Sequence, residues 1–523
     1  MTSTFRSPVR HEIEQILLEH PDVVDVILLD EEGLDGRSYP VAYVTPDAAR
    51  MEQAKSRIYL ADRDKRIAQW RRTFDQVYRS GRDSNAPSFV GWTSNYTNKP
   101  IPEVEMREWL DRTAERILAL APGRVLEIGC GVGLLVQALA PSCSVYRGTD
   151  LSPVAVGRLR EFTATRPELR HVELLEREAT NFDDLEPGSI DTVVLNSVAQ
   201  YFPDIAYLQT VLERAAQVVA SGGHIFIGDV RHLGLLPLFH GAVQLAKAPP
   251  EASVRWLKRR VSLAIEHERE LVVDPQFFFA LSKTVPRIAG AEVLLKRGPS
   301  DNELTRYRYD VVLHVGDAGS SSPAPVAEWQ AGDDTAAELV SRFDAQQFPA
   351  ARILDVPNRR VARDLAMVRM LWSAADRELV KDLRKRAAEE PRTGTDPEDF
   401  WKLSDGPAHD VRVGWSPHAA DGRFDVTLVD RKRALDALSL QRGAGDLSYP
   451  SRGAVATDPL AAAFMQQLGL ELANVLSARI AEPHLPAAVI AVNEIPSDRI
   501  AKSPSIAPDA QPEQRRQAIP EGI

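Results

Sequence analysis

A glycine-rich loop between two acidic residues is the part of this sequence whose residue types point most directly to chemistry. The apolar run 125–128 contains Glu127 and leads directly into residues 129–133, Gly-Cys-Gly-Val-Gly, after which 134–139 has helical spacing. Glycines let a ligand approach the backbone, and the start of a helix offers free N–H groups. A second apolar run ends at Asp150, whose carboxylate can accept both ribose hydroxyls of a nucleoside. This spacing predicts a nucleoside-binding site.

The spacing of the glycines distinguishes between classes of nucleotide site. The dinucleotide fingerprint requires a glycine at the position that Leu134 occupies here. The observed pattern is G-x-G-x-G, with Glu127 two residues before the first glycine. It resembles motif I of class I S-adenosylmethionine-dependent methyltransferases. An isolated glycine loop is often only a tight turn, but the preceding strand and Asp150 favour a binding site. The resemblance implies that the ligand is S-adenosylmethionine, a methyl donor.

Strands and helices alternate regularly around this loop. Apolar runs predict five strands, at 125–128, 144–149, 172–175, 190–197 and 224–231. Helical patterns lie between them, which is typical of an α/β fold with a doubly wound, mostly parallel sheet. Such sheets bind ligands at the carboxyl ends of their strands. Glu127, Asp150, Asn196 and Asp229 lie in or at the ends of these strands, so we expect them to surround one crevice.

The flanking residues form a second, smaller pattern. Residues 11–18 have helical apolar spacing, and 23–29 and 39–44 predict two strands joined by a turn. This arrangement resembles the small C-terminal subdomain of nonribosomal peptide synthetase adenylation domains. Residues 472–480 and 485–489 resemble the closing helix and strand of the same subdomain. The resemblance implies that the core is inserted into this subdomain.

Further segments extend the resemblance along the chain. GWTSNYTNKPIP, VLEIGCGVGLL, GTDLSP, DTVVLNSVAQYFP, GGHIFIGDVR and DNELTRYRYDVVLHVG look like successive motifs of the N-methyltransferase domains embedded in nonribosomal peptide synthetases. We therefore predict a Rossmann-like class I methyltransferase inserted into a small α+β adenylation-type subdomain. The predicted divisions are the first part of that subdomain at 1–50, a helical lead-in and lid at 51–120, the methyltransferase core at 121–316, a linker at 317–330, a post-methyltransferase region with the second part of the subdomain at 331–502, and a disordered tail at 503–523.

Cofactor-binding side chains are expected in the glycine loop, at the strand ends and in the aromatic segment before the core. That segment, 90–102, mixes glycine, polar and aromatic residues without a period, and we interpret it as a lid in preference to an ordinary connection. The residues that the resemblance assigns to S-adenosylmethionine are Tyr96, Glu127, Gly129, Gly131, Gly133, Asp150, Leu151, Asn181 and Asn196.

Catalytic side chains are expected to manage one proton. An amine nucleophile must be neutral, and a weak base or hydrogen-bond acceptor suffices for this. The candidates are Gln200, Tyr201, Asp229, His240 and Glu303. For His240 there are two equal interpretations, a catalytic residue or a histidine on a helix face without a catalytic role. Residues 306–309 alternate Arg and Tyr on a predicted strand, so one pair should face the site.

Composition excludes several partners. The net charge of −11 and the pI near 5.6 argue against nucleic acid, because phosphate binding depends on clustered basic side chains. Cys130 and Cys143 have no metal-ligand spacing and imply no disulfide framework, so we expect no metal and a cytoplasmic protein. No leader sequence and no apolar run long enough to span a bilayer are present, so no membrane partner is expected.

Three hypotheses about function follow. The first is a free-standing methyltransferase that acts on an amino or similar nitrogen of a natural-product precursor, free or held on a carrier protein. The second keeps the donor but has an O, S or C nucleophile on a small metabolite. The third is a non-catalytic partner of a nonribosomal peptide synthetase. Lys502 stands where adenylation domains have a catalytic lysine, but without its flanking glycine and aspartate, and the large adenylation subdomain is missing.

Overall fold

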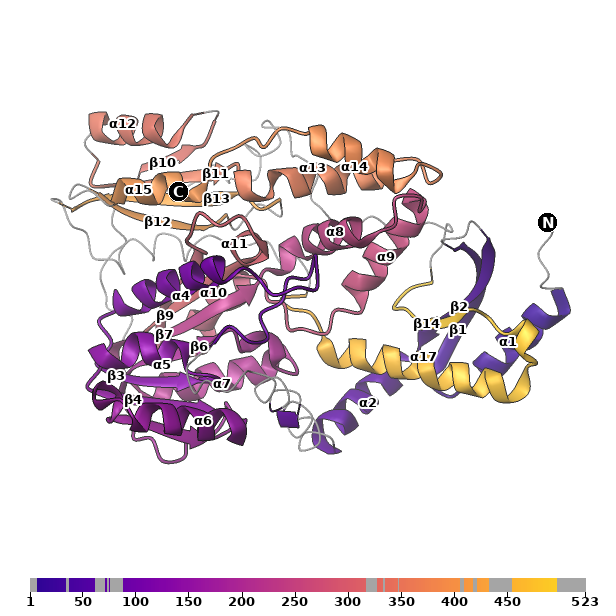
Figure 1. Cartoon of the computed structure of the whole chain (residues 1–523), viewed down its shortest axis with the longest axis horizontal. Helices are drawn as coiled ribbons and strands as arrows, with labels where there is room; N and C mark the ends of the chain where they lie inside the picture. The colour runs from indigo at the N-terminus through magenta and orange to yellow at the C-terminus, as the bar shows by residue number, and fades with distance from the viewer. Residues whose placement is uncertain are drawn as a thin grey trace.

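The computed structural model describes residues 7–33, 37–61, 71–72, 75, 88–316, 327–332, 334–346, 348–404, 409–416, 421–431 and 454–495. Within these ranges the chain forms three β-sheets with helices packed around them (Figure 1). Across the same ranges, no helix combines the length and the apolar character needed to cross a membrane. Lys502 and the predicted tail at 503–523 lie outside the described residues.

A seven-stranded sheet forms the core (Figure 1). Its order is β5 (Val172–Glu176), β4 (Val145–Asp150), β3 (Arg124–Ile128), β6 (Ile190–Asn196), β7 (Val219–Arg231), β9 (Arg308–Val315) and β8 (Ile288–Leu295). The strands from β5 to β7 are parallel, whereas β9 is antiparallel to both of its neighbours. The order reverses at β3, which is where such sheets bind ligands. The predicted doubly wound, mostly parallel sheet is confirmed.

Helices cover both faces of this sheet. They include α4 (Glu103–Leu118), α5 (Leu134–Leu139), α6 (Pro153–Ala164), α7 (Ile205–Val218) and α10 (Gln276–Thr284). Alternate residues of β3 enter two different clusters, because Leu126 packs with residues of α7 and Val125 packs with residues of α4 and α5. A parallel strand between two helical layers must be apolar on both faces. This explains why the run before the glycine loop is almost uninterrupted.

Strand β7 begins earlier than predicted. It starts at Val219 and not at residue 224, so the Ser-Gly-Gly sequence at 221–223 lies within the strand and does not cap α7. The pairing of β6 with β7 is irregular here, shifting from Val219 to His224. A Cβ on Gly223 would lie 2.4 Å from the backbone oxygen of Asp191, so this glycine lets β7 pass close to β6.

The prediction of one strand over residues 306–309 was wrong. Arg306 and Tyr307 belong to the short helix α11 (Glu303–Tyr307), and Arg308 begins β9. Asn302 starts this helix by accepting hydrogen bonds from the backbone N–H groups of Leu304 and Thr305. The change from helix to strand turns Tyr307 and Arg308 toward different neighbours.

A four-stranded sheet lies beside the core. Its order is β10 (Ala327–Gln330), β11 (Ala350–Val356), β13 (Phe424–Asp430) and β12 (His409–Trp415), with α12 (Ala336–Gln346) and α15 (Pro397–Ser404) packed nearby. A Cβ on Gly414 would lie 2.5 Å from the backbone oxygen of Val293, so β12 approaches β8 of the core closely. Residues 327–330 form β10, which corrects the C-terminal end of the linker predicted at 317–330.

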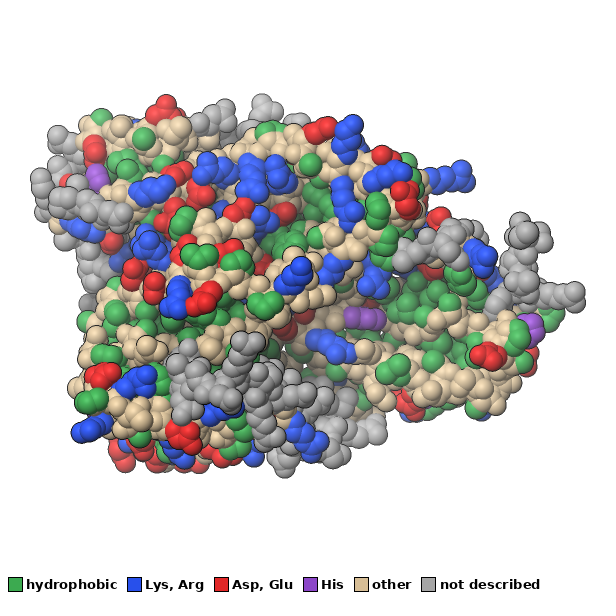
Figure 2. Space-filling view, in the orientation of Figure 1, with side chains coloured by type: hydrophobic (Ala, Val, Ile, Leu, Met, Phe, Trp, Pro, Cys, Tyr) green, Lys and Arg blue, Asp and Glu red, His purple; other side chains and the backbone are tan. Residues whose placement is uncertain are grey.

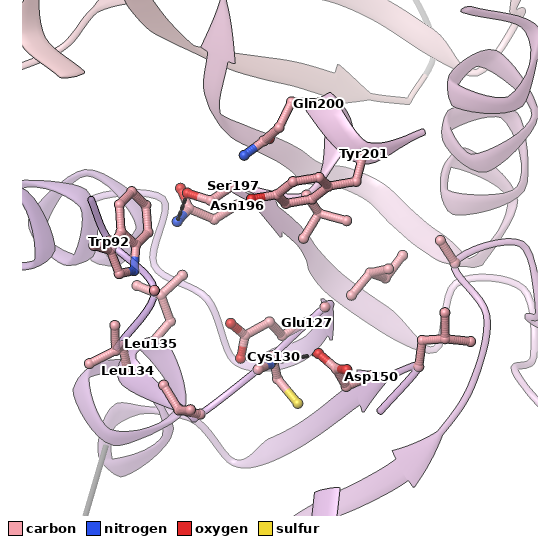
Figure 3. Close-up of a pocket in the computed structure, with 18 of the residues that line it drawn as sticks. Trp92, Glu127, Cys130, Leu134, Leu135, Asp150, Asn196, Ser197, Gln200 and Tyr201 are labelled. Carbon is pink, nitrogen blue, oxygen red and sulfur yellow. Dashed lines mark hydrogen bonds between the residues drawn. The ribbon is translucent and has the colours of Figure 1, made fainter. Parts of the chain in front are cut away.

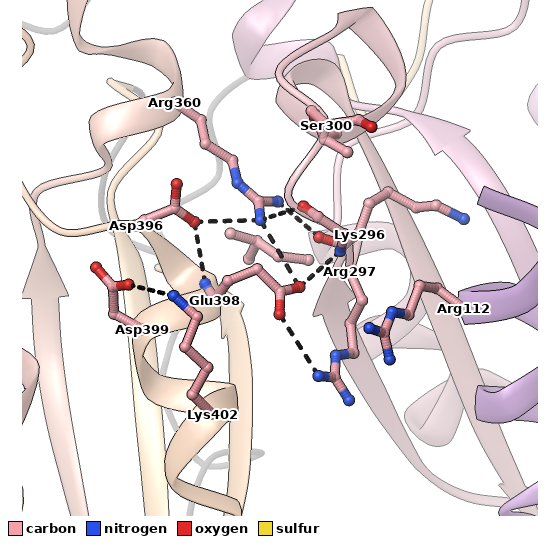
Figure 4. Close-up of polar contacts among 12 residues, drawn as sticks. Arg112, Lys296, Arg297, Ser300, Arg360, Asp396, Glu398, Asp399 and Lys402 are labelled. Carbon is pink, nitrogen blue, oxygen red and sulfur yellow. Dashed lines mark hydrogen bonds and ion pairs between the residues drawn. The ribbon is translucent and has the colours of Figure 1, made fainter. Parts of the chain in front are cut away.

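The side chain of Arg360, near the start of α13 (Arg359–Ser373), joins this second unit to the core (Figure 4). Its guanidinium donates to the backbone oxygens of Lys296 at 2.7 Å and Gly298 at 2.9 Å. Asp396 and Glu398 pair with the same group at 3.3 and 3.8 Å. Burial lowers the pKa of Arg360, and the two acids oppose this change. The partners come from both units, so Arg360 fixes one unit on the other.

Helices of both units cover the carboxyl ends of the core strands. α8 (Leu236–Lys247) and α9 (Val254–Glu266) follow β7, and they pack against α13 and α14 (Val380–Glu389). Val254 and Leu257 from the first pair and Val368 and Leu371 from the second share one hydrophobic cluster. Segments far apart in the sequence therefore close the same end of the sheet.

A small unit brings together both ends of the described chain (residues 7–61 and 454–495). β1 (Val23–Glu32) pairs antiparallel with β2 (Ser38–Pro46), and β14 (Ala488–Ala491) pairs parallel with β2. α1 (Ser7–Leu18), α2 (Ala48–Ala61) and α17 (Pro459–Arg479) pack with this sheet (Figure 1). Hydrophobic side chains gather on the visible face of the small unit (Figure 2).

Candidate active site

A cavity of about 560 Å³ opens at the carboxyl ends of β3, β4 and β6, where the strand order reverses (Figure 3). We call it the strand-end cavity. Its walls are the glycine loop, the end of β4, the turn after β6 and part of the loop at 90–101. The predicted crevice is therefore present, and most of its predicted residues line it.

The glycine loop needs its glycines for backbone conformation and for close packing. Gly129, Gly131 and Gly133 have φ of 77°, 51° and 83°, a region that side chains disfavour. A Cβ on Gly129 would lie 2.3 Å from Val198, and one on Gly133 would lie 2.3 Å from Leu159. Gly129 and Gly131 line the strand-end cavity, but Gly133 does not. Gly133 instead forms the N-cap of α5.

The two acidic residues of the motif occupy one side of the strand-end cavity (Figure 3). The carboxylate of Asp150 accepts hydrogen bonds from the backbone N–H groups of Gly131 and Ser152, each at 2.8 Å. The hydroxyl of Tyr146 donates to Glu127 at 2.8 Å. Burial raises the pKa of Glu127 to about 7, although the Tyr146 hydrogen bond opposes this rise. Both carboxyls are thus held in place and remain available to hydroxyl donors.

The opposite wall presents polar atoms from the end of β6 and from the turn after it. Asn196, Gln200 and Tyr201 line the cavity, as does Ser197 (Figure 3). The side-chain oxygens of Asn196 and Gln200 are buried and have no hydrogen-bond partner among the described residues. A buried acceptor without a donor is costly. These two oxygens therefore fit a polar ligand that fills the cavity.

The loop before the core contributes to the cavity, but not through the residue that was expected. Trp92 and Asn95 line the cavity, and the ring of Trp92 packs on Trp109 with a centroid separation of 4.6 Å. Tyr96 does not line it, and its hydroxyl lies 3.3 Å from that of Tyr307. Adjacent loop residues point in different directions, so composition alone identified the loop and not the contacting residue.

Asn181 is also displaced from its predicted role. The residues that line the cavity in this stretch are Arg177, Glu178 and Ala179, together with Leu151 after β4. The side chain of Asn181 accepts a hydrogen bond from the backbone of Asp183 in a local turn. In this stretch the cavity is therefore lined by the neighbours of Asn181 and not by Asn181 itself.

Asp229 lies below the cavity and not in it. It is fully buried, with Ser197 donating to its carboxylate at 2.8 Å and Trp109 donating at 3.1 Å. Lys296 and Arg308 pair with it at 3.1 and 3.2 Å. Burial alone raises the pKa of Asp229, but these two cations hold it below its ordinary value. Asp229 is therefore an ionised anchor beneath the site, and its predicted direct catalytic role has no geometric support.

A second cavity of about 120 Å³ adjoins the first, and we call it the side chamber. Asn95, Glu270, Glu303 and Arg308 line both cavities. His240 lines only the side chamber, where its Nε2 lies 3.0 Å from Glu268.

Charged groups hold one another in the side chamber. Arg231 pairs with Glu268 at 2.9 Å and with Glu270 at 2.8 Å. Burial opposes ionisation of Glu268, but His240 and Arg231 lower its pKa to about 2. Glu268 is therefore ionised at neutral pH.

Glu303 differs from the other acids of the side chamber in its partners. Its carboxylate accepts hydrogen bonds from the Ser94 hydroxyl at 3.0 Å, the Asn95 backbone at 3.0 Å and the Asn95 amide at 2.7 Å. All of these donors are neutral, and no ion pair to Glu303 occurs among the described residues. Glu303 is 5% exposed. A buried carboxylate without a cationic partner favours a cationic ligand.

Sequence reasoning missed several residues that line these cavities. Trp92 and Ser197 lie within motifs that had been recognised, so their positions were at least indicated. Arg308 belongs to the alternating Arg-Tyr run. The direction of its side chain could not be predicted, because the chain changes from helix to strand within this run. Glu270 follows a helical block without any motif, and only the tertiary structure brings it to the site.

Fold and site together define a class. The sheet is doubly wound, and its cavity lies where the strand order reverses at β3. The glycine loop and Asp150 line this cavity. Together these features form a nucleoside site of the class I methyltransferase type. Residues 126–225 match the sequence model of the family described as "Methyltransferase domain". The described residues contain no group of three or more His, Cys, Asp or Glu side chains placed to hold a metal.

Relatives identify the kind of protein more closely. The chain is 36% identical over 504 residues to the chondramide synthase cmdD of Chondromyces crocatus, covering 93% of this chain and 12% of that protein. It is 33% identical to the cyclosporin synthetase simA of Tolypocladium inflatum, over 58% of this chain and 2% of the relative. It is also 33% identical to the nonribosomal peptide synthetase TES of Alternaria alternata, over 58% of this chain and 6% of that protein.

The chain therefore spans at most about an eighth of the length of these relatives. It contains an S-adenosylmethionine-dependent methyltransferase domain, within a sequence that is similar to nonribosomal peptide synthetases.

Proposed function

We propose that this protein transfers a methyl group from S-adenosylmethionine to an amine nitrogen of a natural-product or peptide precursor. The observation that carries the proposal is Glu303, a buried carboxylate with only neutral donors at the junction of the two cavities. An amine approaches the donor as an ammonium ion or as a neutral N–H donor, and Glu303 suits both. A hydroxyl, thiol or carbon acceptor gains less from an uncompensated negative charge.

The strand-end cavity provides for the donor. Asp150 and Glu127 are placed to accept the ribose hydroxyls, and the backbone of Gly129 and Gly131 lies close to where the donor would be held. When bound, S-adenosylmethionine supplies a methyl group already activated on a sulfonium. The remaining tasks of the protein are alignment, exclusion of water and transfer of one proton, and alignment alone can supply an effective molarity of about 10⁵ M or more.

The side chamber provides for the acceptor. Glu303 holds the amine at the junction, and the free side-chain oxygen of Gln200 and the hydroxyl of Tyr201 orient it from the opposite wall. An α-amino group titrates at about 7.7 to 8, so a weak base suffices to take its proton. His240 lines the side chamber, with its Nε2 3.0 Å from the carboxylate of Glu268, and is the residue to which we assign that proton.

The context of the relatives suggests how the acceptor arrives. The matched proteins are synthases and peptide synthetases of much greater length. We infer that the acceptor is an aminoacyl or peptidyl group, free or tethered to a carrier protein of such an assembly.

The test is transfer of labelled methyl from S-adenosylmethionine to matched acceptors. The panel contains amino acids, their pantetheine thioesters and the corresponding hydroxy acids, so that only the nucleophilic atom differs. We expect label on nitrogen in the amine series. Label on the hydroxy acids alone would replace nitrogen by oxygen as the acceptor.

Glu303→Gln sharpens this test, since it keeps the shape of the side chain but removes the charge and one of the two acceptor oxygens. We expect KM for the amine to rise about tenfold or more, with the Kd for S-adenosylmethionine unchanged. Glu292→Gln is the matched control, because Glu292 pairs with His314 at 2.8 Å and lines neither cavity. A loss of donor affinity in Glu303→Gln would instead assign Glu303 to the ammonium group of the donor.

A further inference from the structure

Residues 267–274 form a non-helical segment between the core and the small unit, and this segment carries a wall of the side chamber. Leu271 donates its backbone N–H to Gln200 at 2.8 Å, and Val273 donates to the backbone of Arg231 at 3.0 Å. Glu268 and Glu270 project from the segment to the guanidinium of Arg231. The position of this backbone therefore determines where both carboxylates lie.

The other edge of the segment is paired with an arm of the small unit, residues 454–458. Ala456 forms an antiparallel bridge with Val273, and the backbone of Asp274 donates to Val455 at 2.8 Å. The arm leads directly into α17, because Asp458 is the N-cap of this helix. Lys55 of α2 pairs with Asp458 at 2.5 Å. The arm is thus a fixed part of the small unit that reaches into the core.

Thr457 makes the contacts that matter most for the chamber. Its hydroxyl accepts a hydrogen bond from the backbone of Val272 at 2.8 Å and donates one to the backbone oxygen of Glu270 at 2.8 Å. Its own backbone donates to Val272 at 3.0 Å. One side chain from the small unit therefore fixes the backbone of Glu270, and Glu270 lines both cavities.

A second connection holds the other end of the segment. The ring of His267 lies 2.9 Å from the backbone oxygen of Ala491 in β14. Arg259 of α9 donates to the hydroxyl of Tyr43 at 2.9 Å and pairs with Glu31 at 3.2 Å. Glu268 and Glu270 therefore lie between two attachment points on the small unit.

We propose that Thr457 is a positioning residue for the acceptor site, through which the small unit holds Glu270 at the wall shared by the two cavities. The inference rests on the proposed function, in which the acceptor occupies this junction. It makes acceptor affinity depend on the docking of the small unit, while the donor contacts of the glycine loop and Asp150 come from the core alone.

The experiment compares Thr457→Val with Thr457→Ser in the full chain. Valine keeps the shape but removes the hydroxyl, whereas serine keeps the hydroxyl. For the valine variant we expect KM for the amine to rise about five- to tenfold, because one or two hydrogen bonds are lost. The Kd for S-adenosylmethionine should not change. The serine variant should behave like the wild type. A purely structural hydroxyl would not separate acceptor KM from donor Kd in this way.

Thr163→Val is the control for a general effect on folding. Thr163 is buried in α6, donates to the backbone of Arg160 at 3.2 Å, and lines neither cavity. The inference is overturned if Thr457→Val leaves KM unchanged, or if both valine variants raise it equally. A wild-type protein that methylates no amine would overturn the proposed function itself, which is a different outcome.

Discussion

The strand-end cavity and the side chamber adjoin each other, yet they are built in different ways. The strand-end cavity takes Asp150, the glycine loop and Asn196 from positions next to the carboxyl ends of neighbouring strands. The side chamber takes its groups from a loop before the core, from β7, α8, α11 and β9, and from the segment at 267–274. One cavity follows from the order of a sheet, and the other follows from how distant segments pack.

This difference fits the tasks proposed for the two cavities. A donor of fixed chemistry can be held by backbone groups and strand-end acids, which any sequence with this motif places alike. An acceptor that varies from protein to protein needs a wall that can change without altering the sheet. The side chamber has such a wall, because Glu268 and Glu270 lie on a non-helical segment outside the core sheet and form ion pairs with Arg231.

Lys296→Met should have the largest effect, and it should act on both cavities. Lys296 pairs with Asp229 at 3.1 Å and Asp310 at 3.0 Å, and all three are buried. Removing Lys296 leaves each buried carboxylate with one cation, Arg308 for Asp229 and Arg116 for Asp310, so we expect the free energy of unfolding to fall by about 3–5 kcal/mol. Urea unfolding followed by tryptophan fluorescence measures it.

Donor Kd and acceptor KM should worsen together in Lys296→Met, because Asp229 supports Ser197 on one side and Arg308 on the other. An effect confined to one cavity would contradict this account of a shared anchor.

Asp150→Ala should weaken donor binding in the strand-end cavity without affecting acceptor binding in the side chamber. It removes the carboxylate assigned to the ribose hydroxyls, and charge-assisted hydrogen bonds contribute about 1.5–3 kcal/mol each. We expect the Kd for S-adenosylmethionine, measured by isothermal titration, to rise about 100-fold or more. Acceptor KM at saturating donor should change little. Unchanged donor binding would remove Asp150 from the site.

Glu127→Gln should have a smaller effect that depends on pH. Burial raises the pKa of Glu127 from 4.5 to about 7. The contribution of the protonated Glu127 carboxyl to the free energy of unfolding is therefore fully present below pH 4.5 and is lost as pH rises through 7. Glutamine stays neutral, so the variant should be more stable than the wild type at pH 8, by about 2 kcal/mol, and similar at pH 4. Thermal unfolding at several pH values measures this.

Asp191→Asn is the control of opposite sign for this prediction. A side-chain hydrogen bond from Arg124 lowers the pKa of Asp191, so its contribution is present above the unfolded pKa and is lost in acid. This variant should lose stability at pH 8. If Glu127→Gln showed no difference between pH 5 and pH 8, the raised pKa of Glu127 would be wrong.

Local sequence was a good guide where the structure is local. The glycine loop, Asp150 and the strand ends follow from residues next to one another, because a parallel strand, a tight turn and a helix start have their own sequence requirements. The role of Gly133 toward the cofactor stays a prediction, and the structure shows this glycine packed against Leu159. Tyr96 and Asn181 were assigned by resemblance to a family, and a motif in a loop does not determine which way each side chain points.

The sequence by itself determined the alternation of strands and helices, the class of cofactor site and the presence of acids at the strand ends. Each of these depends on periodicity or spacing over a few residues. Only the tertiary structure decided that Asp229 is an anchor outside the cavity, because that depends on Lys296, which follows β8, and on Arg308, which begins β9. It also decided that Glu303 lacks a cationic partner and that Thr457 reaches Glu270. Charge balance and distant contacts arise from packing, which spacing along a chain does not specify.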